Sequence, residues 1–393
     1  MTWPTARTAL ERVLSLPASE VSIDLSGGEP LLNPATLRRA VRFVETYRAV
    51  PALVRTTVTT NGTRLTARLL AFLFEHGLTV RISFDGVAAA QRERGGDTFR
   101  TLDRLLDRLR TRHPADFARH VTIHMTVLGS TIRWLADGVE YLLAKGVRRI
   151  EVGSRSTFDR DFQASSREEL ERQVDPILLH SVEHWRHTGE IPVVFLAGPP
   201  LQRAGAPVRD LLCAAPVGRA LGVDTEGRAW GCALFAPSLR SLPPLAAEAA
   251  RALDLGGISA PSFPRRLAAL PRRAGTLRIF TDRLAKRSSY GACAECRFVA
   301  DCHVCPAAIC HIPGNRDPDL VPDFICAFNY ATLAARERFD EMTGGEVSAA
   351  WCGEMKAALA RLEAAVRGLS AGTAASPPGG PARDHERPTH RAP

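Results

Sequence analysis

The chain has 393 residues, of which 45% are hydrophobic and 24% are charged, which places it among soluble globular proteins with one large or two moderate cores. The formal net charge of +9 is carried by arginines scattered among acidic residues, and no basic run is interleaved with aromatic residues, which argues against a nucleic-acid partner. Charged residues follow the start at Arg7 and Glu11, so no apolar signal-peptide core remains, and no apolar run is long enough for a membrane span; a cytoplasmic protein without a membrane partner is expected.

The first half of the chain alternates β-branched apolar runs with amphipathic stretches. Strands are expected at Glu20–Leu25, Val54–Thr60, Leu78–Phe84, Val121–Leu128, Arg149–Gly153 and Ile191–Phe195. Helices are expected near Thr5–Ser15, Pro34–Tyr47, Thr63–Glu75, Thr98–Thr111, Thr131–Lys145 and Arg167–Arg186. This cadence predicts an α/β fold of parallel β/α units, either a barrel or an open doubly wound sheet.

The second half changes character from about Ala197, where glycine- and proline-rich connections begin. The stretch Ala236–Ala274 is expected to be an irregular spacer. A helical segment is expected from about Ala331 to Leu369, with a break near Gly344. The predicted domains are a barrel at 1–205, a cysteine-rich domain at 206–335, a helical segment at 336–369 and a disordered tail at 370–393.

The cysteines are confined to the second half, because all nine lie at or beyond Cys213. Short Cys-x2-Cys steps let two thiolates from one tight turn reach a single metal or cluster, and distant cysteines complete the coordination. Metal ligation is therefore favoured over inert buried thiols, and disulfides are rare in the cytosol. The array consists of Cys213, Cys232, Cys293, Cys296, Cys302, Cys305, Cys310 and Cys326, with Cys352 outlying.

Spacing alone leaves zinc and iron–sulfur ligation open, since zinc ribbons also use Cys-x2-Cys pairs. A hydrolytic zinc site would keep an open position served by histidine or a carboxylate, and only His303 and His311 lie nearby in sequence. Both histidines are expected to be ordinary loop residues.

Polar groups follow three consecutive predicted strands. The first strand runs into Gly27-Gly28-Glu29-Pro30, the second ends at Asn61-Gly62, and the third ends at Ser83-Phe84-Asp85-Gly86. Each segment alone could be a simple turn, because glycine, asparagine and aspartate favour turns. Three in consecutive units, at the carboxyl ends of strands where β/α folds bind ligands, predict a site.

These motifs resemble those of radical S-adenosylmethionine (SAM) enzymes that carry a C-terminal SPASM domain, a group that includes peptide maturases and anaerobic sulfatase-maturing enzymes. The resemblance covers most of residues 5–330 and implies a partial (β/α)6-type barrel that lacks its first strand. It implies that Gly27, Gly28 and Glu29 contact the methionine amino group of SAM, that Ser83 and Asp85 contact its ribose, and that Asn61 lies beside it.

The SPASM pattern implies two auxiliary [4Fe–4S] clusters. Cys213, Gly227 and Cys232 match its first part, and Cys293, Cys296, Cys302 and Cys326 match the ligands of one cluster. Cys213 and Cys232 would hold the other cluster with Cys305 or Cys310. Cys305 comes one residue too early for the family spacing and Cys310 four too late, so the choice between them stays open.

The family's Cys-x3-Cys-x2-Cys motif, whose thiolates hold the cluster that binds SAM, is missing, because the first 212 residues contain no cysteine. Two explanations are weighed: a start codon placed too late, which the retained Glu29, Ser83 and Asp85 favour, or a degenerate paralogue. The chain as given is expected to be inactive.

The complete form is expected to be an oxidoreductase that uses a deoxyadenosyl radical to abstract hydrogen from a peptide or protein. Its electron donor would be a flavodoxin or ferredoxin. The alternative is a non-catalytic iron–sulfur or zinc scaffold that binds a partner peptide.

Overall fold

The computed structural model describes residues 1–18, 20–47, 53–163, 165–203, 205–238, 241–347 and 349. Met1–Ser348 form one compact unit. The predicted tail at 370–393, most of the predicted helical segment at 336–369 and Cys352 lie outside the described residues.

A five-stranded parallel sheet forms the first half of the chain. Its strands are β1 (Glu20–Leu25), β2 (Leu53–Thr60), β3 (Thr79–Ser83), β4 (Val121–Val127) and β5 (Ile150–Ser154), and they lie in the order in which they occur along the chain. A doubly wound sheet would reverse direction at a switch point. The unbroken order therefore selects the barrel type, and the sheet is a half barrel.

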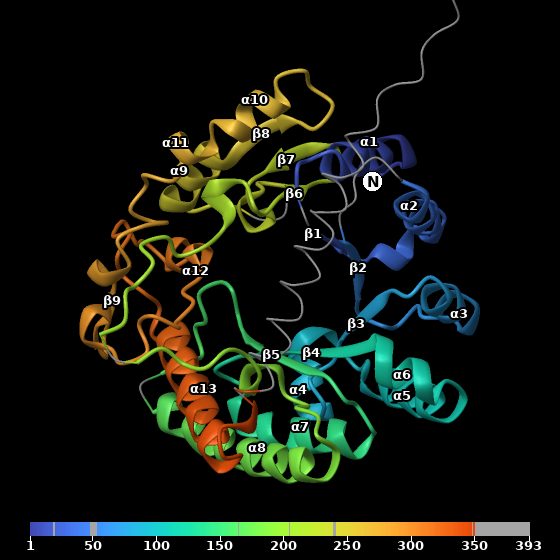
Figure 1. Ribbon diagram of the computed structural model, residues 1–393, viewed down its shortest axis with the longest axis vertical. Coiled ribbons are helices and arrows are strands. Elements are labelled where there is room, and N and C mark those ends of the chain that lie inside the picture. The colour runs from blue at the N-terminus through green and yellow to red at the C-terminus, as the bar shows by residue number, and fades with distance from the viewer. Residues whose placement is uncertain are drawn as a thin grey trace, which may run out of the picture. The chain divides into compact units, whose positions relative to one another are not determined.

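Helices lie before, between and after these strands, mainly along the outer side of the curved sheet (Figure 1). They are α1 (Trp3–Leu14), α2 (Pro34–Thr46), α3 (Ala67–Glu75), α4 (Ala88–Gly95), α5 (Phe99–Arg112), α6 (Pro114–His120), α7 (Leu135–Ala144) and α8 (Ser166–Thr188). Local signals set where several of them begin: the Asn33 side chain accepts from Thr36 N (3.2 Å) before α2, and Thr66 accepts from Leu69 N (3.2 Å) before α3.

The two faces of the sheet differ in polarity. Val58, Val80, Ile82 and Ile123 have no exposed surface and belong to the core shared with the outer helices. The alternate positions on the same strands carry polar side chains, which therefore project from the inner face. Parallel sheets are usually apolar on both faces, so this polar inner face indicates a ligand-binding interior.

One predicted strand does not form. At Ile191–Phe195 the chain makes a single parallel bridge between Val193 and Ile150 and then enters the 3-10 helix η3 (Val194–Leu196). Pro192 lacks the N–H that a ladder requires, and only its carbonyl takes part, accepting from Ile150 N (2.7 Å).

The expected irregular spacer at 236–274 was also wrong. It contains α9 (Pro244–Leu253), β8 (Asp254–Gly257), α10 (Phe263–Ala268) and α11 (Leu270–Arg273). The prolines that suggested irregular structure lie in the first turns of these helices, where a missing N–H costs nothing.

The cysteine-rich part is built from short elements around its own core. A three-stranded antiparallel sheet joins β6 (Gly222–Val223), β7 (Arg228–Trp230) and β8, and β9 (Arg287–Ser288) pairs with β10 (Gly291–Ala292). The remaining elements are η4 (Ala215–Val217), η5 (Ala233–Phe235), η6 (Arg283–Ala285), η7 (Cys293–Glu295), α12 (Pro306–Cys310) and α13 (Asp323–Met342). Phe324 and Phe339 of α13 lie in the barrel core, whereas Ile325 lies in the core of the cysteine-rich part, so α13 links the two.

Candidate functional site

Glu29 ties the glycine turn after β1 to the end of β2. Its Oε1 accepts hydrogen bonds from Leu31 N (3.0 Å) and from the Thr60 hydroxyl (2.7 Å), and its Oε2 accepts from Asn61 N (2.8 Å). A carboxylate offers about four acceptor positions. One position on Oε2 is therefore left for a donor outside the chain.

The turns beside Glu29 depend on glycine. Gly27 has φ of +128°, and a Cβ on Gly27 or Gly28 would meet nothing within 4 Å, so the backbone at this edge is open to a ligand. Gly62 has φ of +75°, and a Cβ there would lie 2.7 Å from the Leu102 side chain. The Asn61 Oδ1 accepts from both the backbone N (3.0 Å) and the hydroxyl (2.8 Å) of Thr63, so this side chain stabilises its own turn.

Asp85, just after β3, is bound by the protein itself. Arg94 of α4 donates to both of its carboxylate oxygens, from Nε at 2.8 Å and from Nη2 at 2.7 Å, and Thr126 N of β4 donates to Oδ1 at 2.9 Å. Only 6% of Asp85 is exposed. Its main observed role is to fix α4 and β4 against the end of β3, while Ser83 is half-buried and paired in register with His124.

The inner face also carries charged residues that the sequence motifs did not single out. Arg81 of β3 pairs with Asp24 of β1 (Nη1–Oδ2, 3.2 Å) and with Glu151 of β5 (Nε–Oε2, 2.8 Å). Burial and the positive charge of Arg94 lower the pKa of His124, which is therefore neutral at neutral pH. The sequence signal that could have identified these residues is the alternation of polar with buried apolar residues on β3, β4 and β5.

Four thiols gather around η7 and the start of α13. Cys302, Cys326 and Cys296 are near enough to Cys293 for their charges to raise its pKa further, beyond the main effect of burial, and Cys326 and Cys296 act on Cys302 in the same way. Two side chains donate to sulfur in this Cys293 set: Asn329 Nδ2 to Cys302 Sγ (3.3 Å) and the Ser288 hydroxyl to Cys326 Sγ (3.2 Å).

The other four thiols form a Cys213 set. Cys213 is close to Cys232 and Cys305, and Cys305 is in turn close to Cys310, which is completely buried at the end of α12. Cys305, the N-cap of α12, is the member that links Cys213 to Cys310. The structure thus brings both Cys305 and Cys310 into the Cys213 set.

Burial of these side chains raises the pKa of several of the thiols. Burial raises the pKa of Cys293 and Cys310 to about 12 and that of Cys213 and Cys302 to about 11, so they are protonated at neutral pH in the metal-free chain. Uptake of iron or zinc must therefore release protons from them.

A single zinc ion and an iron–sulfur cluster place different demands on their ligands. A zinc ion binds thiolates at about 2.3 Å, which puts neighbouring sulfurs about 4 Å apart. No three His, Cys, Asp or Glu side chains among the described residues are arranged to hold a single ion. A cluster of several iron and sulfur atoms holds its ligands farther apart than one ion does.

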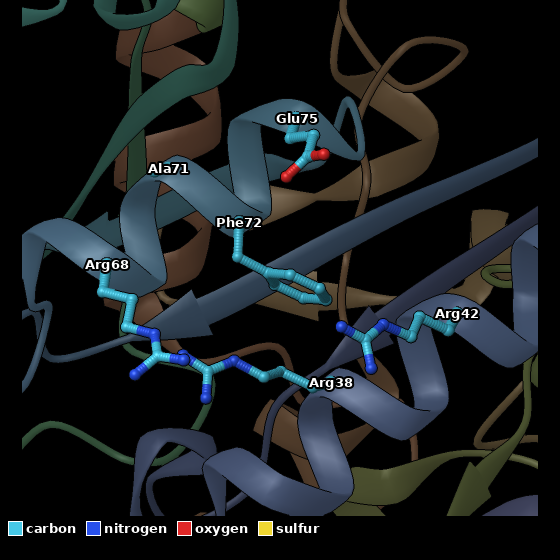
Figure 2. A pocket seen from close by; sticks show the side chains of 6 residues that line it. All are labelled: Arg38, Arg42, Arg68, Ala71, Phe72 and Glu75. Atoms are coloured by element: carbon cyan, nitrogen blue, oxygen red, sulfur yellow. The ribbon is translucent and has the colours of Figure 1, made fainter.

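A pocket of about 500 Å³ lies elsewhere, between α2 and α3 (Figure 2). Figure 2 shows the Phe72 ring and three arginine side chains directed toward this space; the guanidinium carbons of Arg38 and Arg42 lie 5.6 and 5.5 Å from the ring centroid. None of its lining residues comes from the carboxyl ends of the strands, so this pocket is separate from the candidate site.

No helix of the described chain is long and apolar enough to cross a bilayer.

The comparison with known families supports the radical SAM part of the resemblance seen in the motifs. Residues 2–142 match the family described as the Radical SAM superfamily. No curated protein sequence matches the chain.

Solved structures share the fold at low sequence identity. One is anSMEcpe with bound AdoMet, at 14% identity and a TM-score of 0.63, with 89% of each chain covered. Another is anSMEcpe with bound AdoMet and a Kp18Cys peptide, at 13% identity and a TM-score of 0.61, covering 90% of this chain and 91% of that one. A third is Streptococcus suis SuiB bound to S-adenosylmethionine, at 13% identity and a TM-score of 0.52, covering 83% and 70%. These similarities confirm the partial barrel fold.

Proposed function

We propose, for a chain whose residues 2–142 match the radical SAM superfamily, that the complete protein is a radical SAM/SPASM oxidoreductase that modifies a peptide or protein. SAM, when bound and reductively cleaved, supplies a deoxyadenosyl radical that abstracts hydrogen from the substrate. The observation that carries the proposal is the presence, in one chain, of the glycine–glutamate turn at the strand ends and of two sets of four partly or fully buried cysteines. The peptide bound to one structural neighbour supports the substrate class.

Glu29 is the residue that receives the amino group of SAM in this proposal. Its remaining Oε2 position suits one N–H of an ammonium group, and Gly27 and Gly28 leave room for the ligand beside it. Ser83 and Asp85 are proposed to face the ribose, with Asn61 alongside. Because Arg94 and Thr126 N already donate hydrogen bonds to the Asp85 carboxylate, Asp85 contributes mainly by holding the end of β3 in place.

The Cys293 set (Cys293, Cys296, Cys302 and Cys326) and the Cys213 set (Cys213, Cys232, Cys305 and Cys310) are proposed to ligate one auxiliary [4Fe–4S] cluster each. Proximity of Cys305 to both Cys213 and Cys310 supports including both residues. Bound clusters would supply one-electron chemistry, with a flavodoxin or ferredoxin as the outside donor. Reduced thiols suit the cytoplasm, which is the proposed compartment.

A scaffold function is the second candidate. Because the first 212 residues contain no cysteine, residues 1–393 alone are proposed to assemble auxiliary clusters without cleaving SAM, and such a chain would still bind a partner peptide. Reductive SAM cleavage by the complete protein, reconstituted without oxygen, separates the enzyme from the scaffold.

Metal content tests the cluster assignment. The chain, purified and reconstituted without oxygen, is expected to hold about eight iron and eight sulfide ions, because two cubane clusters contain four of each. Iron, acid-labile sulfide and zinc are measured on the same sample. Stoichiometric zinc without sulfide would establish the zinc scaffold instead.

Glu29→Gln tests the SAM contact. The amide nitrogen cannot accept from Asn61 N or carry the charge that an ammonium group requires, so SAM is expected to bind about tenfold more weakly or worse. Calorimetric titration of the reconstituted protein measures this, with Glu20→Gln at the start of β1, the strand that precedes Glu29, as the matched control. Equal affinity in Glu29→Gln and the unmodified chain would contradict the assignment.

A further inference from the structure

A buried arginine lies among the thiols of the Cys293 set. Arg283, the first residue of η6, is 6% exposed. Its Nη1 donates to the carbonyl oxygens of Cys302 (2.8 Å) and Val299 (3.0 Å), and its Nη2 to that of Leu211 (3.5 Å). Its buried Nε has no hydrogen-bond partner. All of its acceptors are therefore neutral.

Unlike Arg283, two neighbouring basic residues have carboxylate partners. Lys286, 1% exposed, pairs with Asp319 at 2.8 Å, and Arg297, which follows the ligand Cys296, is half exposed and pairs with Glu337 at 3.0 Å. No ion pair within the described part of the chain includes Arg283. A buried charge without a counter-ion is strongly unfavourable, so an anion supplied from outside the chain is needed here.

The backbone is constrained to place this side chain. Asp282, directly before Arg283, has φ of 55°, and across the described residues it is the one non-glycine with positive φ. Its N–H donates to Asp210 Oδ1 at 2.9 Å, which fixes the turn. Such conformations are uncommon and cluster at functional sites.

The charge of Arg283 lies beside the Cys293 set. Its Nη1 is 2.8 Å from the carbonyl oxygen of Cys302, and a cation at this place favours negative charge on the group that the set binds. The hydrogen bonds from Asn329 and Ser288 to sulfur work in the same direction, because they also favour negative charge on sulfur. At the Cys213 set the carboxylate of Glu248 adds negative charge near Cys310 instead.

We propose that Arg283 is the counter-charge of the cluster held by the Cys293 set, and that it gives this cluster a higher reduction potential than the cluster held by the Cys213 set. The inference rests on the proposed cluster ligation. An oxidised [4Fe–4S] cluster with four thiolates carries two net negative charges, and uptake of one electron adds a third. A fixed cation stabilises the more negative state, so electrons collect at the Cys293 set.

The test is a potentiometric titration of the reconstituted full chain with dithionite and mediators, followed by electron paramagnetic resonance. Arg283→Met is expected to lower one of the two midpoint potentials by about 59 mV or more, which is a tenfold change in the ratio of reduced to oxidised cluster. The other potential should stay within a threefold change of that ratio. Arg283→Lys, which keeps the charge, should restore most of the shift.

Arg297→Met is the matched control, since it removes an exposed and paired arginine beside the same ligands and should change the ratio less than threefold. A wild-type chain that takes up no iron would overturn the proposed function itself. Two clusters whose potentials are unchanged in Arg283→Met would overturn the role of Arg283 alone. If Arg283→Met loses iron, the test rests on Arg283→Lys, which keeps the charge. A tenfold change in its ratio of reduced to oxidised cluster, compared with the unmodified chain, contradicts the proposal. An unchanged ratio supports the proposal.

Discussion

Replacing Cys302 by alanine should remove one cluster and leave the other, so that bound iron falls from about eight to about four per chain. The physical reason is the division of the thiols: Cys302 interacts with Cys293, Cys296 and Cys326, whereas Cys213 interacts with Cys232 and Cys305. Cys213→Ala should have the same effect on iron, and the double variant should hold none. Iron and sulfide analysis of reconstituted protein measures all three.

Single variants at the remaining thiols sharpen this test. Cys305→Ala and Cys310→Ala are each expected to reduce iron by about half, because both residues belong to the Cys213 set. Cys352→Ala, a cysteine outside both sets, is the matched control and should keep the full iron content. Loss of all iron in Cys302→Ala, with circular dichroism unchanged, would contradict two independent sites.

The sequence predicted the strands of the half barrel well because their pattern is strong. β1 matches its predicted bounds, and β2 to β5 differ from theirs by one residue at one or both ends, since apolar residues alternate regularly with polar ones there. The same pattern could not choose between a barrel and an open sheet. That choice depends on strand order, which the parallel pairing β1-β2-β3-β4-β5 supplies.

Proline caused most of the wrong local predictions. Ile191–Phe195 was predicted as a strand from its apolar residues, but the missing N–H of Pro192 reduces that segment to one bridge. Pro244 suggested irregular chain, yet it opens α9. α4 was not predicted, because Ala88–Gly95 has no apolar face of helical period.

The candidate site was predictable as a set of motifs but not as a set of contacts. The positions of Glu29, Asn61 and Asp85 at strand ends followed from the sequence. The hydrogen bonds that occupy Glu29 and Asp85 did not, because they depend on how α4 and the strand ends approach one another. Arg283 was missed for a similar reason: it lies outside the cysteine pattern, and only burial and the lack of a carboxylate partner distinguish it.

The ion pair between Arg94 and Asp85 is expected to contribute more to stability than other pairs in the barrel. Asp85 is almost completely buried and accepts both Arg94 bonds and Thr126 N, so Arg94→Met would leave a buried carboxylate without its cation. Losing one partner of a buried pair typically costs about 3–5 kcal/mol in the free energy of unfolding. Urea denaturation followed by circular dichroism measures the change.

Arg55→Met provides the matched control for this prediction. Arg55 also donates from Nε to a carboxylate, Oε1 of Glu20, at the same 2.8 Å, but both side chains are exposed, 66% and 49%. Water already solvates these charges, so removing Arg55 should cost less than about 1 kcal/mol. Equal destabilisation by Arg55→Met and Arg94→Met would show that burial of Asp85 is not the cause. The Asp85 carboxylate holds α4 and β4 to the end of β3, where Ser83 lies. If Arg94→Met loses more free energy of unfolding than Arg55→Met and also binds SAM more weakly, the stability of this pair is connected to the shape of that strand end.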